Sequence, residues 1–223
     1  SGITDSAASG TCLATGQKTN NGVIGLAHDS TPVYSVASQL KQQGWGVGIM
    51  TTVTIDHATP SAHYAHTPSR ENYYTIGTQL VESNFDFFGG AGFSRPVDKN
   101  NDAAPNLYDL AQTNGYALVA GYEDVQKHSA AKKMILLPEY YQDYYTSFAG
   151  SLPYAIDRTS SDLTLSQIVE VAIDRLSTYD RFFIMADGGK FYYAIHANDV
   201  ATVLHEVLDF DKAIKVAYRF YEQ

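Results

Sequence analysis

A short segment near the N-terminus contains a serine in a position suited to phosphate chemistry. Ser6 directly follows Asp5 and opens a run of small residues, 7–11, that can wind into a helix. The first turn of a helix has unpaired N–H groups and the positive end of the dipole, so it attracts phosphate. A serine there could attack phosphorus as a nucleophile. The alternative is that Asp5 or Ser6 only caps an ordinary helix.

A second polar segment follows a predicted buried strand. The apolar run 45–50 predicts the strand, and a loop with His57 and Thr59 leads from it into a helix. Arg70 lies further along, and its planar guanidinium can donate two parallel hydrogen bonds to a phosphoryl group. The alternative for Arg70 is a solvated surface charge. This order of elements predicts polar ligands at the carboxyl end of a strand.

A third segment, 181–199, has an apolar run that ends in Asp187 and two glycines. Such an ending is typical of a parallel strand that delivers a ligand to the edge of a sheet. His196 follows nine residues after Asp187, and Tyr192 lies between them.

Together these segments resemble the nucleophile, magnesium and zinc segments of the alkaline phosphatase family. The resemblance implies that Ser6 is the serine that becomes phosphorylated and that Arg70 grips the phosphate. It assigns Thr59 to a magnesium ion and His57 to a position that tunes the metal site. Asp5 is expected to orient Arg70, although a helix-start aspartate explains it equally well.

The metal ligands depart from the family pattern. The family uses two zinc ions and one magnesium ion, and Asp187 stands at the position of a magnesium-binding glutamate. His196 matches a zinc histidine, but Tyr192 replaces the zinc aspartate. A neutral phenol with a pKa near 10 is a poor zinc ligand. We therefore expect weak or absent binding of Zn²⁺ and Mg²⁺ by this chain.

The resemblance runs almost end to end, since segments 85–93, 152–158 and 205–214 also match. It implies an α/β fold whose mainly parallel sheet is flanked by helices on both faces, a three-layer sandwich. We expect one domain, 1–223, that is incomplete: an upstream metal-binding aspartate, a downstream Asp-His pair and another zinc histidine of the family lie outside it.

Periodicity and turn signals predict the same class of fold. Helices are predicted at 33–43, 61–64, 76–83, 107–114, 165–177 and 207–217. Strands are predicted at 46–50, 85–88, 116–119 and 133–137, with a strand stub at 2–4. Alternating strands and helices indicate a parallel sheet.

Bulk composition excludes several classes of partner. The 223 residues include 15 Lys and Arg against 24 Asp and Glu, a net charge of −9, which argues against nucleic acid and anionic membrane surfaces. No apolar run approaches the length of a membrane span. Cys12 is the single cysteine, so no intrachain disulfide can form.

The expected function is hydrolysis of small-molecule phosphate monoesters through a phosphoserine. By resemblance the protein is periplasmic or secreted and forms a homodimer, and the altered metal positions imply impaired activity in this chain. The main alternative is an inactive α/β module that at most binds phosphate weakly. A sulfatase or phosphodiesterase branch of the same superfamily is a further alternative.

Overall fold

A five-stranded parallel sheet forms the centre of the molecule in the computed structural model, which describes residues 2–144 and 150–223. The strands are β1 (Gly46–Thr51), β2 (Phe87–Gly89), β3 (Tyr116–Ala120), β4 (Lys133–Leu137) and β5 (Phe182–Asp187). Their order is β3-β4-β2-β1-β5, and every neighbouring pair is parallel. All carboxyl ends therefore meet at one edge of the sheet, where the predicted site residues follow β1 and end β5.

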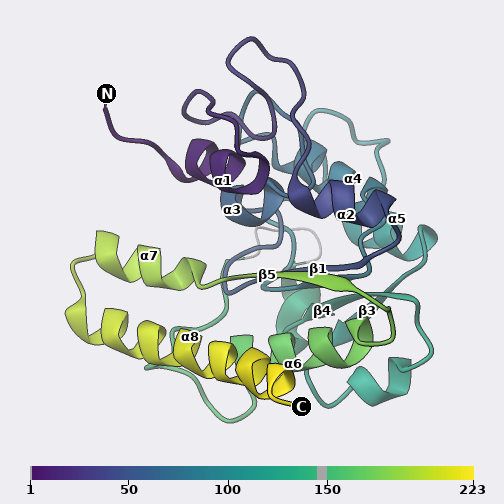
Figure 1. Cartoon of the computed structure of the whole chain (residues 1–223), viewed down its shortest axis with the longest axis vertical. Coiled ribbons are helices and arrows are strands. Elements are labelled where there is room, and N and C mark those ends of the chain that lie inside the picture. Colours follow the sequence, from purple (N-terminus) through teal and green to yellow (C-terminus); the bar gives the residue numbers. More distant parts are fainter. Residues whose placement is uncertain (1, 145–149) are drawn as a thin grey trace.

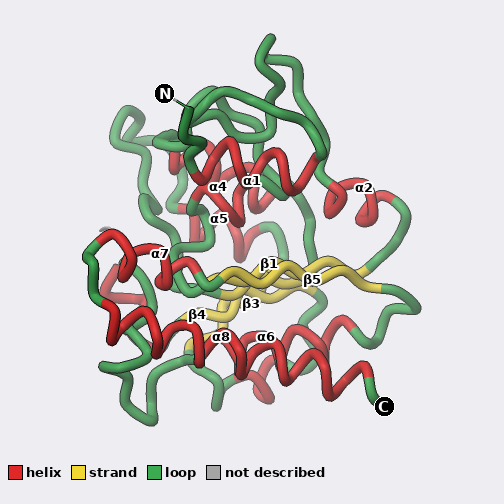
Figure 2. The backbone as a smooth tube through the Cα atoms, turned by 60° about the vertical axis from the view of Figure 1, so that its left-hand side comes forward, coloured by secondary structure: helices red, strands yellow, loops and turns green. Residues whose placement is uncertain are grey.

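Helices cover both faces of this sheet (Figures 1 and 2). One face carries α1 (Ser6–Thr15), α2 (Val36–Gln42), α3 (Ala58–Ser61), α4 (Tyr73–Glu82) and α5 (Leu107–Thr113). The other carries α6 (Leu165–Leu176) and the long α8 (Val200–Tyr221), while α7 (Gly189–His196) leaves β5 directly. Two 3-10 turns, η1 (Val125–His128) and η2 (Glu139–Tyr144), flank β4. The predicted α/β class with a parallel sheet is confirmed, and no described helix has the length and apolarity to cross a membrane.

Glycines allow α6 to pack close to the sheet. A Cβ atom at Gly89 would lie 2.2 Å from Cγ2 of Ile168, and one at Gly48 would lie 2.9 Å from Cδ1 of Leu176. A side chain at either strand position would force α6 side chains to shift, most severely at Gly89, where the close atom is the branched methyl of Ile168. Gly89, the first residue of the glycine cluster, therefore allows close packing of α6 at a strand-to-loop crossing.

Local signals explain where the main helices begin. Thr164 and Gln167 form a reciprocal capping box at the start of α6. The Asp5 side chain accepts a hydrogen bond from the Ala8 N–H at the start of α1, and α1 ends at Gly16, whose φ of 74° suits glycine.

Three sequence expectations differ from the structure. The helix expected at 61–64 lies at Ala58–Ser61, and α7 was not anticipated as a helix. The strand stub at 2–4 is wrong: residues 2–5 form no strand. Instead, the Asn21 side chain bonds this segment, donating to the Ile3 carbonyl at 2.9 Å and accepting from the Asp5 N–H at 3.1 Å.

Candidate active site

Ser6 is the first residue of α1, directly after the capping residue Asp5. In the first turn the Ala8 N–H is taken by the Asp5 carboxylate at 3.0 Å and the Ser9 N–H by the Asp5 carbonyl at 2.9 Å. The N–H groups of Ser6 and Ala7 remain for an anion in the described part of the chain. The geometry thus matches the predicted helix N-terminus.

Asp5 connects this helix start to Arg70. Its second carboxylate oxygen accepts from the Gly22 N–H at 3.1 Å and from Nη1 of Arg70 at 3.3 Å, and the Arg70 N–H donates to the Gly22 carbonyl at 2.7 Å. Burial raises the pKa of Asp5, but hydrogen bonds from Ala8, Gly22 and Arg70 outweigh it and hold the pKa below its ordinary value. Asp5 is therefore ionised at neutral pH, beside the guanidinium.

His57 precedes α3 and contacts a residue that the sequence did not single out. Its Nε2 lies 3.1 Å from the Tyr193 hydroxyl, and the two rings meet edge to face with centroids 5.9 Å apart. Burial, assisted by the positive charge of Arg70, lowers the pKa of His57 to about 4. The imidazole is thus neutral at pH 7, and Arg70 is close enough to influence it.

Thr59 and Asp187 lie on elements that pack together. Thr59 is in α3, which contacts β5, and Asp187 is the last residue of β5. The Asp187 carboxylate accepts a hydrogen bond from the Thr51 hydroxyl at 2.9 Å, and burial raises the pKa of Asp187. The helix of Thr59 also packs against α1: a Cβ at Gly10 would lie 3.4 Å from the Thr59 Cα.

His196 is not brought into this group. It is the last residue of α7, an exposed position about 10 Å along the helix from its start. Its ring packs edge to face against Tyr192, with centroids 4.3 Å apart. Among the described residues no group of three or more His, Cys, Asp or Glu side chains could hold a metal ion.

Lys190, one turn after Asp187, is a further site neighbour that sequence reasoning missed. Its side chain is 5% exposed; Nζ donates to the Ser151 hydroxyl at 3.0 Å and lies 3.2 Å from the Tyr154 ring centroid. Its backbone N–H donates to the Thr52 hydroxyl at 3.0 Å, just beyond β1. These partners are 36 to 138 residues away, so no local pattern could have indicated them.

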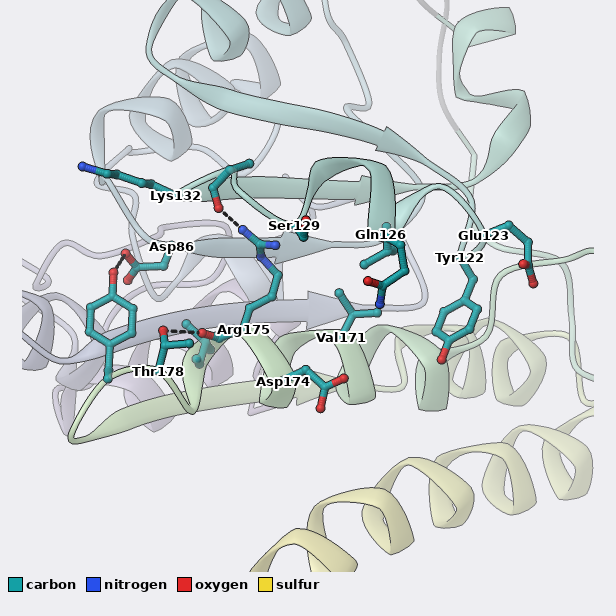
Figure 3. A pocket seen from close by; sticks show the side chains of 14 residues that line it. Asp86, Tyr122, Glu123, Gln126, Ser129, Lys132, Val171, Asp174, Arg175 and Thr178 are labelled. Atoms are coloured by element: carbon teal, nitrogen blue, oxygen red, sulfur yellow. Dashed lines mark hydrogen bonds between the residues drawn. The ribbon is translucent and has the colours of Figure 1, made fainter.

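A cavity of about 640 Å³ lies elsewhere, between α6 and the connection from β3 to β4 (Figure 3). Two of its charged groups, Asp86 and Arg175, are bonded to other parts of the protein. Asp86 accepts from Lys41 at 2.7 Å and from the Tyr179 hydroxyl at 2.6 Å, and Arg175 donates to the His128 and Ala131 carbonyls. Neither Ser6 nor Arg70 lines this cavity, so the candidate site is the region around these two residues.

The protein is of the α/β class, with a parallel sheet whose strand β5 ends at Asp187 and with Asp5 joining the start of α1, where Ser6 lies, to Arg70. The family model described as "Alkaline phosphatase" matches residues 1–223, so the chain belongs to the alkaline phosphatase family. Alkaline phosphatase 4 of Bacillus subtilis (strain 168) is 35% identical over 98% of this chain and 46% of its own length. The repressible alkaline phosphatase of Saccharomyces cerevisiae is 29% identical over 99% of this chain and 43% of its own.

Solved structures give the same result. The alkaline phosphatase of the Antarctic bacterium TAB5 superimposes with a TM-score of 0.85 at 29% identity, covering 99% of this chain and 62% of the other. A cold-active alkaline phosphatase from Shewanella sp. gives 0.84 at 29% identity, covering 99% and 51%. The chain thus spans about half the length of the curated relatives it matches.

Proposed function

We propose that this chain forms the phosphate-binding part of an alkaline phosphatase, a phosphomonoesterase that acts through a phosphoserine. The observation that carries the proposal is the link from the N-terminus of α1 through Asp5 to Arg70. It joins two anion-binding devices, helix N–H groups and a guanidinium, beside a serine hydroxyl.

In this mechanism Arg70 and the N–H groups of Ser6 and Ala7 hold non-bridging phosphate oxygens. The Ser6 hydroxyl loses its proton as its oxygen attacks phosphorus, and the P–O bond to the leaving alcohol breaks, with the alkoxide taking up a proton. Water then attacks the phosphoserine, which releases inorganic phosphate and restores the hydroxyl. Charge that develops on the equatorial oxygens is stabilised by the same donors.

Thr59 and Asp187 are the residues we propose to hold magnesium. Hydroxyl and carboxylate oxygens suit this hard cation, and Asp187 already has a fixed orientation from Thr51. One of the related solved structures is a variant of the TAB5 alkaline phosphatase with Mg bound in its M3 site. When bound, Mg²⁺ would supply positive charge beside the phosphate, and water would complete its coordination shell.

The described residues do not fit a zinc site. His196 packs against Tyr192 at an exposed helix end, and the described residues include no group of three or more His, Cys, Asp or Glu side chains that could hold a metal ion. The Ser6 hydroxyl also makes no hydrogen bond to a basic side chain in the described ranges, so we expect the 223-residue chain alone to be weakly active at best.

For the protein in which this part acts, we propose small-molecule phosphate monoesters as substrates, with no nucleic acid or membrane as partner. We also propose that this protein is periplasmic or secreted and that it forms a homodimer. Residues 1–223 would then form a single domain. The second candidate function, an inactive α/β module that binds phosphate weakly, is favoured by one observation, the Tyr192–His196 pair at the zinc position.

A phosphate-ester assay with added Zn²⁺ and Mg²⁺ separates the two candidates. It should compare the chain, its Ser6→Ala variant and a longer protein that includes the rest of the family's length. Turnover that Ser6→Ala abolishes supports the phosphomonoesterase. Turnover that is unchanged in Ser6→Ala, or none in the longer protein, would reject the proposed nucleophile.

A further inference from the structure

The long helix α8 carries a stripe of apolar side chains on its outer face. In the part of the chain that the structure describes, six large side chains of this stripe are between 46% and 84% exposed: Val200, Leu204, Val207, Ile214, Tyr218 and Tyr221. The helix contacts α6 and α7 and lies at the periphery of the molecule in both views (Figures 1 and 2). A surface helix ordinarily turns its apolar stripe toward the core. A contiguous apolar stripe that faces outward marks an interaction surface.

The inner face of α8 holds this stripe on the outside. Two acids, Glu206 and Asp209, are among its buried residues. Glu206 accepts a hydrogen bond from the Ala155 N–H at 2.7 Å, and Asp209 accepts one from Nη1 of Arg158 at 2.9 Å. Rotation of α8 to bury the apolar stripe would break these bonds and leave the Arg158 charge without its buried partner, which is strongly unfavourable. The stripe can therefore be covered only by a partner.

The spacing of the stripe is that of a coiled-coil helix. Its six apolar positions and Asp211 are separated alternately by four and three residues, which amounts to about three heptads. This spacing keeps all seven side chains on one face of the helix. A heptad stripe packs best against a second helix, because each of its side chains fits between four residues of the facing helix.

The stripe is also large enough for a stable contact between two helices. Together with Leu208, which flanks it, the exposed apolar side chains present on the order of 800 Å², which is what each partner contributes to a standard interface. The helix has 22 residues and is about 33 Å long. A second α8 has the same length and can cover the stripe from end to end.

The charges on α8 favour an antiparallel arrangement of two such helices. Asp211 lies in the middle of the stripe and pairs with Lys215 of the same helix at 2.6 Å. In a parallel pair the two Asp211 carboxylates would face each other, and like charges repel. In an antiparallel pair, Asp211 of each copy lies against Ile214 of the other and beside its Lys215. The exposed Lys212 and Arg219, the latter in the last turn of α8, keep this surface from being acidic although the chain has a net charge of −9.

We propose that the stripe of α8 binds the α8 of a second copy of this chain, in an antiparallel pair with two-fold symmetry. A two-fold contact uses the same surface on both copies, so one self-complementary stripe is sufficient. The inference rests on the homodimer of the proposed function, to which it gives a contact surface, and it is independent of the phosphate site.

Sedimentation equilibrium of the full 223-residue chain measures this association. We expect a dimer with a Kd of about 10 μM or tighter, as for other interfaces of this size. Leu204→Glu and Ile214→Glu should each weaken the dimer about ten-fold or more, because each places an unpaired charge between the two helices. His205→Glu is the matched control: it adds the same side chain one residue after Leu204, at an exposed position off the stripe, and should keep the dimer. Thermal unfolding verifies that each variant folds.

Disulfide trapping tests the orientation. In a Cys12→Ser background, chains with Val207→Cys are mixed with chains with Tyr218→Cys and oxidised with glutathione disulfide. An antiparallel pair brings position 207 of one copy to position 218 of the other, so the mixed disulfide should predominate over both symmetric ones. Predominance of the symmetric disulfides would show a parallel pair and overturn the proposed arrangement.

A chain that stays monomeric at all concentrations would overturn the proposal, as would a dimer that both glutamate variants leave intact. A longer protein that includes the rest of the family's length tests the other occupant. If Leu204→Glu dissociates its dimer, the α8 contact holds there as well. If Leu204→Glu lowers its thermal stability and leaves its oligomeric state unchanged, further chain covers the stripe and the proposal is wrong.

Calorimetry with inorganic phosphate separates this result from the proposed phosphatase activity. A chain that dimerises through α8 but does not bind phosphate would refute the phosphate site alone. A chain that binds phosphate as a monomer would refute the α8 contact alone.

Discussion

The Asp5 carboxylate caps α1 with one oxygen and lies 3.3 Å from Nη1 of Arg70 with the other. One side chain thus sets both the start of the helix that carries Ser6 and the position of the guanidinium. Both side chains are partly exposed, at 28% for Asp5 and 23% for Arg70, so the ion pair itself adds little stability. The ion pair matters mainly because it orients Arg70 relative to the start of α1.

Arg70→Ala should weaken binding of inorganic phosphate about ten-fold or more, because hydrogen bonds to a charged group are lost. The free energy of unfolding should change by less than about 1 kcal/mol, since the ion pair is exposed to solvent. Calorimetry and urea unfolding measure the two quantities. Arg219→Ala serves as the control, and unchanged phosphate affinity in Arg70→Ala would remove Arg70 from the site.

Asp5→Ala should destabilise the chain by about 1 kcal/mol at pH 7 through loss of the helix cap. The folded pKa of Asp5 is below its ordinary value of 3.8, so its ionised form stabilises the fold above that pH. This contribution disappears as the pH falls below 3.8 toward the folded pKa. Unfolding followed from pH 7 to pH 3 should therefore show the difference between the two proteins shrinking in acid; a constant difference contradicts the role of the charge.

The buried Asp56 should give the free energy of unfolding the opposite dependence on pH. It is fully buried, and burial raises its pKa from 3.8 to about 6, although hydrogen bonds from Thr54 and Ser94 oppose the shift. The folded state then binds the Asp56 proton more tightly than the unfolded state does. The contribution of Asp56 to the free energy of unfolding is therefore greatest below pH 4 and decreases as the pH rises to 6. A shift of this size corresponds to on the order of 3 kcal/mol.

Asp56→Asn provides the matched comparison. The variant should lose this decrease between pH 4 and pH 6, whereas Asp98→Asn, at the surface loop, should keep it. Urea unfolding at intervals across this range measures the slope. If the slopes of the Asp56→Asn variant and the original chain coincide, Asp56 is already ionised in the folded state below pH 4.

Much of the sheet was predictable because its strands carry local signals. The predicted bounds of β4 at 133–137 are confirmed residue for residue, and β1 extends one residue past its predicted end at Met50. The strand predicted at 2–4 is wrong because this segment is bonded by the side chain of Asn21 and not by the backbone of another strand. A polar side chain of this kind gives no strand pattern in the sequence. The α7 helix was not predicted because it contains the aromatic run 191–193, and aromatic residues are weak helix formers that are also common in strands.

The site was only partly predictable. Proximity of Asp5 and Arg70 followed from the expected roles, and the structure brings the two together across 65 residues. The Tyr193–His57 contact spans 136 residues, and no periodicity reports such a pair. The roles of Ser6, Thr59 and Asp187 stay predictions, since they depend on a bound phosphate or metal.

The last prediction concerns zinc. Tyr192 occupies the position at which the family resemblance places a carboxylate ligand, and it packs against the only other predicted zinc residue, His196. The purified chain should therefore retain well below one zinc ion after dialysis, as measured by elemental analysis. Stoichiometric zinc would show that other residues complete the site.

Tyr192→Asp should raise zinc occupancy, because it places a carboxylate one helical turn before His196, where both side chains lie on one face of α7. Phe191→Asp is the matched control: it adds the same charge to the same helix but at a spacing of five residues from His196, off that face. Both variants should be loaded with equal zinc and dialysed together. A gain in Tyr192→Asp alone supports the ligand argument, whereas equal gains would attribute the effect to charge, and no gain in either would reject Tyr192 as the residue that prevents zinc binding.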